Sequence, residues 1–195
     1  MKAFAKQLLL QHQVFNAAAI DALLDHTTVE TFDKGAVVIQ EGRVCHKCYF
    51  VLKGCLRQYR NVEGIEKTCG FYQETDQVVM YSSYFSGLSA DTSIQCMEDC
   101  ILLSGTKAQE AAMYEAHPAT DNLVFRLLSD DYRKAEEYIN LLNAYNPEQR
   151  YQALLQSKPA ILNRVPLVHI ASYIGVTPES LSRIRKRIVD NAGKV

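Results

Sequence analysis

The 195-residue sequence lacks any apolar run that approaches the roughly 20 residues needed to cross a bilayer. Its first eight residues, Met1-Lys2-Ala3-Phe4-Ala5-Lys6-Gln7-Leu8, have no long apolar core and no small-residue cleavage site, so a secretory signal is not expected. Low-complexity segments and internal repeats are also absent. We therefore expect a cytoplasmic globular chain without a membrane partner, in which the six cysteines are free thiols.

Motifs of catalysis are missing as well. The sequence contains no nucleophile elbow, no phosphate-binding glycine loop and no His-Glu-x-x-His pair. Among residues 28–106 only His46 is a histidine, whereas a metal enzyme built on a β roll needs several clustered on its strands. We expect no enzymatic activity, no catalytic residue, no cofactor and no bound metal.

Net charge is nearly absent, but the charges are unevenly distributed. Residues 147–195 carry eight Lys or Arg and three Asp or Glu, whereas residues 1–146 carry thirteen and nineteen. A basic end on an acidic body indicates that one part of the chain meets a polyanion and the other does not.

The hydrophobic periodicity changes twice along the chain. Residues 3–25 favour helix, with Asn16 as a helix cap, and from about Thr28 short runs of Val, Ile, Tyr and Phe alternate with glycines. Such a pattern predicts an all-β sandwich or barrel. The expected strands are residues 36–39, 49–52, 56–59, 66–71 and 93–103, with a hairpin turn at 61–64.

A long helix is predicted over residues 119–145, which contain neither Gly nor Pro and are followed by Pro147. Apolar residues recur in it at spacings of 3 and 4, as in a two-stranded coiled coil. These dimer-interface candidates are Phe125, Leu128, Tyr132, Ala135, Ile139 and Leu142. The alternative is a helix that packs on its own β domain.

Residues 170–187 have the spacing of a helix-turn-helix. Ala171 is small where two helices would cross, and Gly175 can adopt the left-handed conformation that ends the first helix. Thr177 can cap the second helix, and Pro178 fits its first turn.

The second helix of this motif would place polar side chains in a DNA major groove. Its first half carries the candidates for base contacts, namely Glu179, Ser180, Ser182 and Arg183. Arg185, Lys186 and Arg187 follow and suit phosphates. The alternative is an ordinary helical hairpin with a solvated basic end.

Taken together, the chain resembles the Crp/Fnr family of bacterial transcription regulators. Residues 32–42 and 49–57 look like its cyclic-nucleotide-binding-type jelly roll, and residues 170–187 look like its DNA reader. The resemblance implies an α+β protein with a jelly-roll sensor domain and N-terminal helices (1–117), a dimerisation helix (118–146) and a helix-turn-helix domain (147–195). It implies double-stranded DNA, a second copy of the chain, RNA polymerase and a small-molecule effector as partners.

The effector site departs from the nucleotide-binding members of that family, in which a Glu holds the ribose and an Arg the cyclic phosphate. Residues 68–106 contain no Lys or Arg, and a buried phosphate needs such a donor. The matching pocket residues are Met80, Tyr81, Ser82, Ser83, Tyr84, Asp91 and Thr92. We expect no cyclic nucleotide there, and either a neutral or aromatic ligand or a pocket filled by its own side chains.

Two further departures concern the cysteines and the C-terminus. Residues 1–44 contain no cysteine, so the iron–sulfur cluster of oxygen-sensing relatives is not expected. Cys45 and Cys48 have a C-x-x-C spacing that suits a metal or redox pair, and Cys96 and Cys100 are predicted to face the same way on one strand. About seven residues follow Ile188, too few for the family's β wing. A ligand-binding module that has lost DNA binding is therefore an alternative function.

Overall fold

A computed structural model describes residues 1–12, 16–118 and 121–192, with the backbone alone at 121–127 and 191–192. The helices are α1 (Lys2–His12), α2 (Ala17–His26), α3 (Tyr81–Ser86), α4 (Lys107–Ala116), α5 (Asp121–Ala144), α6 (Pro147–Ser157), α7 (Ile161–Arg164), α8 (Leu167–Tyr173) and α9 (Pro178–Ala192). The strands are β1 (Thr28–Phe32), β2 (Val37–Ile39), β3 (Lys47–Lys53), β4 (Leu56–Val62), β5 (Ile65–Tyr72), β6 (Gln77–Val78), β7 (Ser93–Cys96) and β8 (Cys100–Thr106).

The strands form two antiparallel four-stranded sheets, in the orders β1-β8-β3-β6 and β2-β7-β4-β5. Alternation of side chains along β3 and β8 gives the first sheet two buried faces. Val51 and Leu102 point into the core between the sheets, whereas Leu52 and Leu103 point outward into a second core formed with α1 and α2. Asn16 caps α2 by accepting the Ala19 N–H at 2.8 Å, as the sequence predicts.

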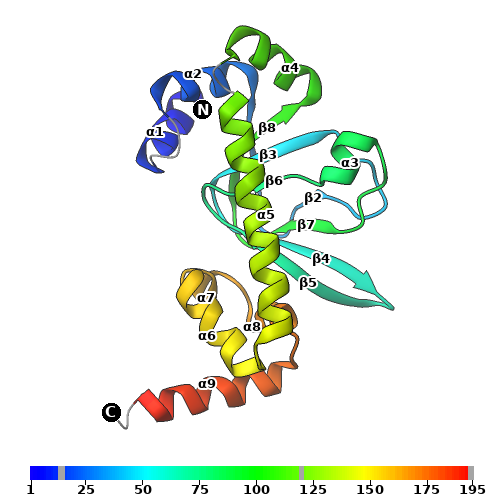
Figure 1. Cartoon of the computed structure of the whole chain (residues 1–195), viewed down its shortest axis with the longest axis vertical. Coiled ribbons are helices and arrows are strands. Elements are labelled where there is room, and N and C mark those ends of the chain that lie inside the picture. The colour runs from blue at the N-terminus through cyan, green and yellow to red at the C-terminus, as the bar shows by residue number, and fades with distance from the viewer. Residues whose placement is uncertain (13–15, 119–120, 193–195) are drawn as a thin grey trace.

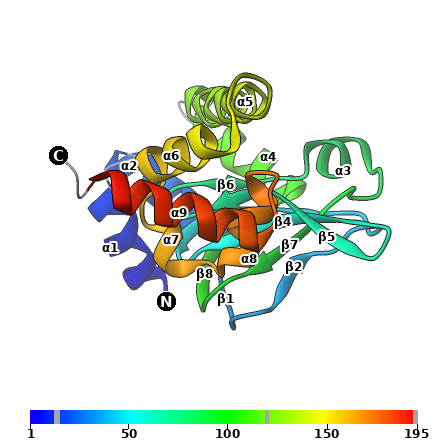
Figure 2. The same cartoon turned by 90° about the horizontal axis from the view of Figure 1, so that it is seen from below.

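Helix α5 runs along the molecule, from the end that holds α2 and α4 to the end that holds α6–α9 (Figure 1). We call α6–α9 the C-terminal helices. Seen from below, α9 lies in front of the β strands (Figure 2), at the opposite end of the molecule from α4 (Figure 1).

The sequence-based expectation of one strand over residues 93–103 is wrong. Two strands occupy this stretch, β7 and β8, and they belong to different sheets. The chain turns between them at residues 97–99, where the Asp99 carboxylate accepts the Lys34 N–H at 2.9 Å and the Met97 N–H donates to Cys55 O. The expectations also omitted β1, β6, α3 and α7. Within the described residues, which end at Ala192, no strand follows α9.

The turn between β3 and β4 requires glycine at residue 54 for two reasons. Gly54 has a φ of +113°, and a Cβ atom there would lie 2.5 Å from Cys100 Sγ and 2.9 Å from Cys100 Cα. Gly35 also has a positive φ, +87°, but a Cβ atom there would meet nothing within 4 Å.

We expect Gly54→Ala to lower the free energy of unfolding by about 1–3 kcal/mol more than Gly35→Ala, because only the first substitution adds an atom to a filled site. Urea unfolding of both variants and the wild-type measures the difference. Equal losses in the two variants would contradict the close approach at Gly54.

Candidate nucleic-acid interface and effector cavity

A tight turn joins α8 and α9. Gly175 has a φ of +73°, and the Val176 N–H donates to Ala171 O at 2.9 Å. Ala171 is fully buried, and Thr177 Oγ1 accepts the Ser180 N–H at 3.3 Å. The left-handed turn and the helix cap lie at the residues where the sequence predicts them, and the small residue Ala171 is buried.

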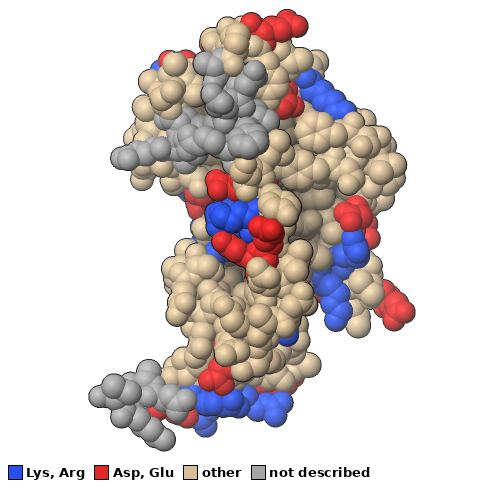
Figure 3. Space-filling view, in the orientation of Figure 1, with Lys and Arg blue, Asp and Glu red and all other residues tan. Residues whose placement is uncertain are grey.

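Helix α9 presents two different faces. Leu181 and Ile184 are buried in an apolar cluster with the other C-terminal helices. The side chains predicted to contact DNA lie on the rest of its surface. Ser180 is partly buried, and the others are exposed, namely Glu179, Ser182, Arg183, Arg185, Lys186 and Arg187. Figure 3 shows Lys and Arg side chains gathered over α9, an arrangement suited to a polyanion.

The charged side chains among these that have partners within the protein include Glu179, Arg183 and Arg187. Hydrogen bonds from its own backbone N–H and from the Thr177 hydroxyl lower the pKa of Glu179. Arg183 Nε lies 3.5 Å from Glu179 O, one helical turn back. Arg187 pairs with Glu148 of α6 at 2.7 Å, so a phosphate has to compete with this carboxylate.

The C-terminal helices pack directly on the β sandwich. One apolar cluster combines Cys55, Phe71 and Met97 of the sandwich with buried residues of α6–α9, among them Leu154 and Ile170. The helices and the sandwich therefore share a core.

A hydrogen bond and an aromatic contact also join β5 to α8. The Thr68 N–H donates to Ser172 Oγ at 2.9 Å, and the ring centres of Phe71 and Tyr173 are 5.1 Å apart. Strand β5 is the last in its sheet, so Ser172 supplies an acceptor to an edge strand.

Arg57 of β4 is a fully buried cation, 1% exposed, at the contact between the sandwich and the C-terminal helices. Its Nη1 contacts His169 Nδ1 of α8, and its Nη2 donates to Glu66 and to Gln95. The guanidinium lies 4.2 Å from the centre of the Tyr59 ring. Burial and the Arg57 charge lower the pKa of His169.

A second arginine ties α7 to the sandwich. Arg164 donates to Glu74 at 2.8 Å and to Glu98 at 2.5 Å. These hydrogen bonds raise the pKa of Arg164. Burial alone would raise the pKa of Glu74, but the hydrogen bonds from Arg164 and from backbone N–H groups, together with the Arg164 charge, lower that pKa.

A third arginine connects α5 to the C-terminal helices. Arg150 of α6 donates to Leu142 O and Tyr145 O at the end of α5, and to Ile174 O at the end of α8. Helix ends leave carbonyl groups without intrahelical partners, and one guanidinium satisfies those of two helices here.

A cavity of about 760 Å³ lies between the β sandwich, α5 and the C-terminal helices, and this volume suits a small organic ligand. Five of the seven predicted effector-pocket residues line it, namely Met80, Tyr81, Ser82, Ser83 and Asp91. Tyr84 and Thr92 are not among the residues that line this cavity. Tyr84 turns away because its hydroxyl donates to Glu110 of α4 at 2.8 Å.

Thr92 lies behind the cavity wall in a chain of side-chain contacts. The Tyr72 hydroxyl donates to Gln58 Oε1, and Gln58 Nε2 donates to Thr92 Oγ1, both at 2.9 Å. Thr92 Oγ1 in turn lies 3.3 Å from Met80 Sδ. On the side of the cavity formed by the β sandwich, which we call its β wall, these polar groups are therefore hydrogen-bonded to one another.

Residues 68–106 bring no Lys or Arg to the cavity, but helices from outside this stretch form part of its wall and do. Lys134 of α5 and Lys158 of α6 line the cavity. Lys134 Nζ is 2.6 Å from Asp76 and 3.8 Å from Asp131. The Tyr81 hydroxyl donates to Asp131, and burial raises the pKa of both groups.

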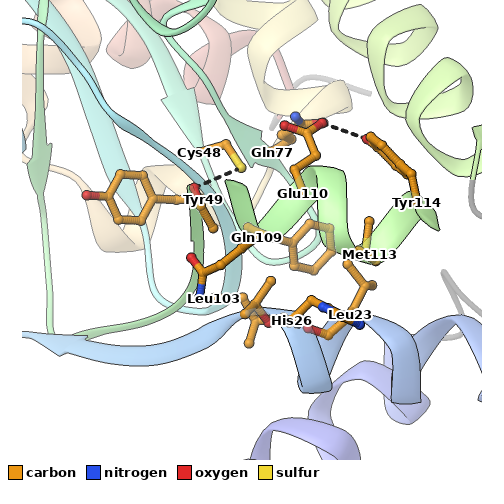
Figure 4. A pocket seen from close by; sticks show the side chains of 13 residues that line it. Leu23, His26, Cys48, Tyr49, Gln77, Leu103, Gln109, Glu110, Met113 and Tyr114 are labelled. Carbon is orange, nitrogen blue, oxygen red and sulfur yellow. Dashed lines mark hydrogen bonds between the residues drawn. The ribbon is translucent and has the colours of Figure 1, made fainter. Parts of the chain in front are cut away.

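A smaller cavity of about 90 Å³ lies between α2, β3, β8 and α4 (Figure 4). Leu23, Leu103 and Met113 give it an apolar lining, and the Tyr114 hydroxyl at its edge donates to Glu110 at 2.6 Å. It is below the size of usual ligand pockets, so the larger cavity is the candidate effector site.

All six cysteines are free thiols, as expected, but Cys96 and Cys100 do not share a strand. Cys96 and Cys100 lie on consecutive strands of different sheets, yet their thiols meet, and this hydrogen bond raises the pKa of Cys96. Burial raises the pKa of Cys45 and of Cys48, which makes their thiols poor nucleophiles. In the part of the chain that the structure describes, no three His, Cys, Asp or Glu side chains are grouped to hold a metal ion.

The predicted dimer seam lies largely on the surface of α5. Leu128, Tyr132 and Ile139 are 38%, 67% and 56% exposed, and Ala135 is exposed as well. Leu142 is partly buried, and the side chain of Phe125 lies outside the described residues. Ala135 also lines the larger cavity.

The sequence analysis predicted no role for four residues that lie between the sandwich, α5 and the C-terminal helices, namely Arg57, Lys134, Lys158 and His169. Their partners are far away in the chain: Arg57 and His169 are 112 positions apart, and Lys158 contacts Phe71 across 87 positions. No motif marks these pairs. The only sequence signal for these residues is that residues 68–106 contain no Lys or Arg. Any cation in the pocket must therefore come from another part of the chain.

Comparisons with known proteins agree with this architecture. The family model of the cyclic nucleotide-binding domain matches residues 29–117, which include most of the sandwich and α4. A comparison with curated proteins found no match. In the described part of the chain, every helix is too short or too polar to cross a membrane.

Solved structures share the fold. FixK2 from Bradyrhizobium japonicum is 16% identical, with a TM-score of 0.71 over 85% of this chain and 86% of that one. The c-di-GMP-responsive regulator CLP from Xanthomonas campestris is 14% identical, with a TM-score of 0.73 over 91% and 93%. The Thermus thermophilus catabolite activator protein is 18% identical, with a TM-score of 0.56 over 95% and 87%. At these identities the likenesses show that the chain shares the fold of these proteins.

We expect the contact between α8 and β4 to weaken in acid. The pKa of His169 is lowered below its ordinary value of about 6.5, so the folded state favours the neutral ring that accepts from Arg57. The stability from this contact is present above that value and is lost as the pH falls, because a protonated ring would face the Arg57 cation, with the Glu66 carboxylate beside it.

Thermal unfolding between pH 7.5 and 5.5 measures this effect. His169→Gln keeps an acceptor without a titrating proton and should lose less stability over this range than the wild-type. His46→Gln, a change at an exposed histidine, should behave as the wild-type does. Equal pH dependence in the wild-type and His169→Gln would refute the role of His169.

Proposed function

We propose that this chain, whose residues 29–117 belong to the cyclic nucleotide-binding domain family, is a DNA-binding transcription regulator of the Crp/Fnr type. The observation that carries the proposal is the exposed basic face of α9, on a helix whose apolar face is buried against the rest of the molecule. Two of the similar solved structures are named as a regulator and an activator, so we propose no catalytic role.

The arrangement of α9 supports DNA reading. Glu179 and Arg183 lie one turn apart near its N-terminal end, the part of a recognition helix that meets base edges. Arg185 and Lys186 are exposed further along and suit phosphates. Arg187 would join them only after leaving Glu148.

An exposed apolar stripe on α5 supports dimerisation, which this function requires. Leu128, Tyr132 and Ile139 are large apolar side chains on one stripe of α5 that solvent reaches in a single chain. Parallel pairing of two α5 helices along this stripe would bury them. The two α9 helices would then read half-sites one helical turn apart, about 34 Å.

The larger cavity is proposed as the effector site, and its β wall does not favour a cyclic nucleotide. The contacts from Tyr72 through Gln58 to Thr92 use polar groups of that wall. Asp91 lies at the cavity with its carboxylate paired to Arg60, so this cation is already neutralised. A cyclic phosphate would have to break these contacts and be desolvated.

We expect selection from random double-stranded DNA to yield a near-palindromic site. Arg183→Ala should cost roughly 1–3 kcal/mol of binding free energy and relax the preferred base at one position in each half-site. Lys186→Ala should weaken binding to all sequences alike and reduce the salt slope by about one unit.

Fluorescence anisotropy at several salt concentrations measures both effects. An unchanged selected site with Arg183→Ala would remove that residue from base reading. If the wild-type selects no DNA, the chain is instead a ligand-binding module that has lost DNA binding.

We expect the wild-type to sediment as a dimer at about 10 µM and Leu128→Glu to sediment as a monomer, because the substitution would bury unpaired charges in the seam. Asn140→Glu adds the same charge at another exposed position of α5 and should leave the dimer intact. A monomeric wild-type, or equal behaviour of the two variants, would show that the seam is not the interface.

A further inference from the structure

The larger cavity extends beyond the β sandwich to the C-terminal helices. At this end its wall is formed by Phe71 of β5, Tyr138 of α5, Leu154 and Lys158 of α6, and Tyr173 of α8. We call these five residues the junction site. A ligand here would touch the sandwich, the long helix and the C-terminal helices at once.

Lys158 is a cation in the junction site without a carboxylate partner among the described residues. Its ammonium group donates to Phe71 O at 2.9 Å, and its salt-bridge distance to every described Asp or Glu exceeds 4.0 Å. Burial lowers the pKa of Lys158. The side chain is only partly buried. Even partial burial of a charge without an ion-pair partner costs free energy, and its ammonium group has three protons to donate.

The carboxylates around Lys158 are engaged elsewhere. Asp76 accepts from Lys134 at 2.6 Å and from the Gln73 N–H at 2.9 Å. Glu137 pairs with Arg133 at 2.5 Å. Asp76 and Glu137 act on Lys158 only from a distance, so its positive charge has no direct carboxylate partner beside the cavity.

Aromatic rings form the walls next to this charge. The rings of Tyr138 and Tyr173 are stacked with their centres 4.8 Å apart, and the Phe71 ring lies 5.1 Å from that of Tyr173. Leu154, which is almost fully buried, continues the apolar surface. Such walls favour a flat or apolar body over a heavily hydroxylated one.

We propose that the junction site binds a small organic monocarboxylate, with its carboxylate on Lys158 and its apolar body against Tyr138 and Tyr173. The inference rests on the proposed effector role of this cavity and names the chemical class of the effector. A single ammonium group matches a single negative charge. A dianion such as a phosphate monoester is disfavoured, because Asp76 and Glu137 both act on Lys158 and would repel the second charge.

Occupancy of the site would act on the C-terminal helices through Lys158 itself. Its hydrogen bond to Phe71 O links the end of α6 to β5. A bound carboxylate would share or replace this bond, so it would favour one placement of α6 on the sheet over another. The ligand would bias the position of α9 without touching it.

The test is thermal unfolding of the full chain with benzoate, phenylacetate and 3-phenylpropanoate, each at 10 mM. At least one should raise the melting temperature by about 5 °C, if its dissociation constant is about 0.1 mM. The matched alcohols, sodium chloride at the same ionic strength and cyclic AMP should not. No shift with any of the three carboxylates, or equal shifts with the alcohols, overturns the proposal.

Variants then locate the site. Lys158→Met should lose the carboxylate shift, and Lys158→Arg should keep it because it keeps the charge. Lys53→Met removes an exposed lysine of β3 and should keep the full shift. A full shift in Lys158→Met would refute the assignment to Lys158. If Lys158→Met does not fold, Lys158→Arg serves instead, and loss of the shift in that variant would refute the assignment.

This experiment contains no DNA, so its outcome is separate from that of the proposed function. A carboxylate shift in a chain that selects no DNA would retain the site and reject the regulator. Selection of a DNA site by a chain that shows no carboxylate shift would retain the regulator and reject the carboxylate site. Where both succeed, the carboxylate should change the affinity for the selected DNA in the wild-type and not in Lys158→Met.

Discussion

The packing of the C-terminal helices on the β sandwich is the contact on which the rest of this structure depends. Phe71, Cys55 and Met97 of the sandwich belong to the same apolar cluster as the buried residues of α6–α9. A helical segment of fewer than fifty residues buries little surface by itself. Its core is therefore completed by the sheet, and the position of α9 in the molecule is a property of this shared core.

The polar contacts at the junction give this packing a defined orientation, which apolar contacts alone specify less well. Arg57, Arg164 and Lys158 each make bonds between the sandwich and a different helix, namely α8, α7 and α6. Because these bonds are directional, a shift of the C-terminal helices would break several of them together. Arg150 adds the end of α5 to the same assembly.

The cavity lies where these connections meet, so the proposed sensing and reading functions share a structural element. Its β end is bordered by the contacts of Tyr72, Gln58 and Thr92, and its other end by Lys158 and the aromatic rings. Helix α5 borders both ends and also carries the exposed stripe proposed for dimerisation. A ligand, the partner chain and α9 are thus linked through one helix and one shared core.

Local rules let the sequence predict the Asn16 cap, the hairpin of β4 and β5, the long helix and the turn at Gly175, because each depends on residues only a few positions apart. The break between β7 and β8 was missed, since strands of different sheets can follow one another as a continuous apolar run. The cations of the cavity could not be predicted either. Lys134 and Lys158 reach it through contacts across 58 and 87 positions, and only tertiary packing brings such residues together.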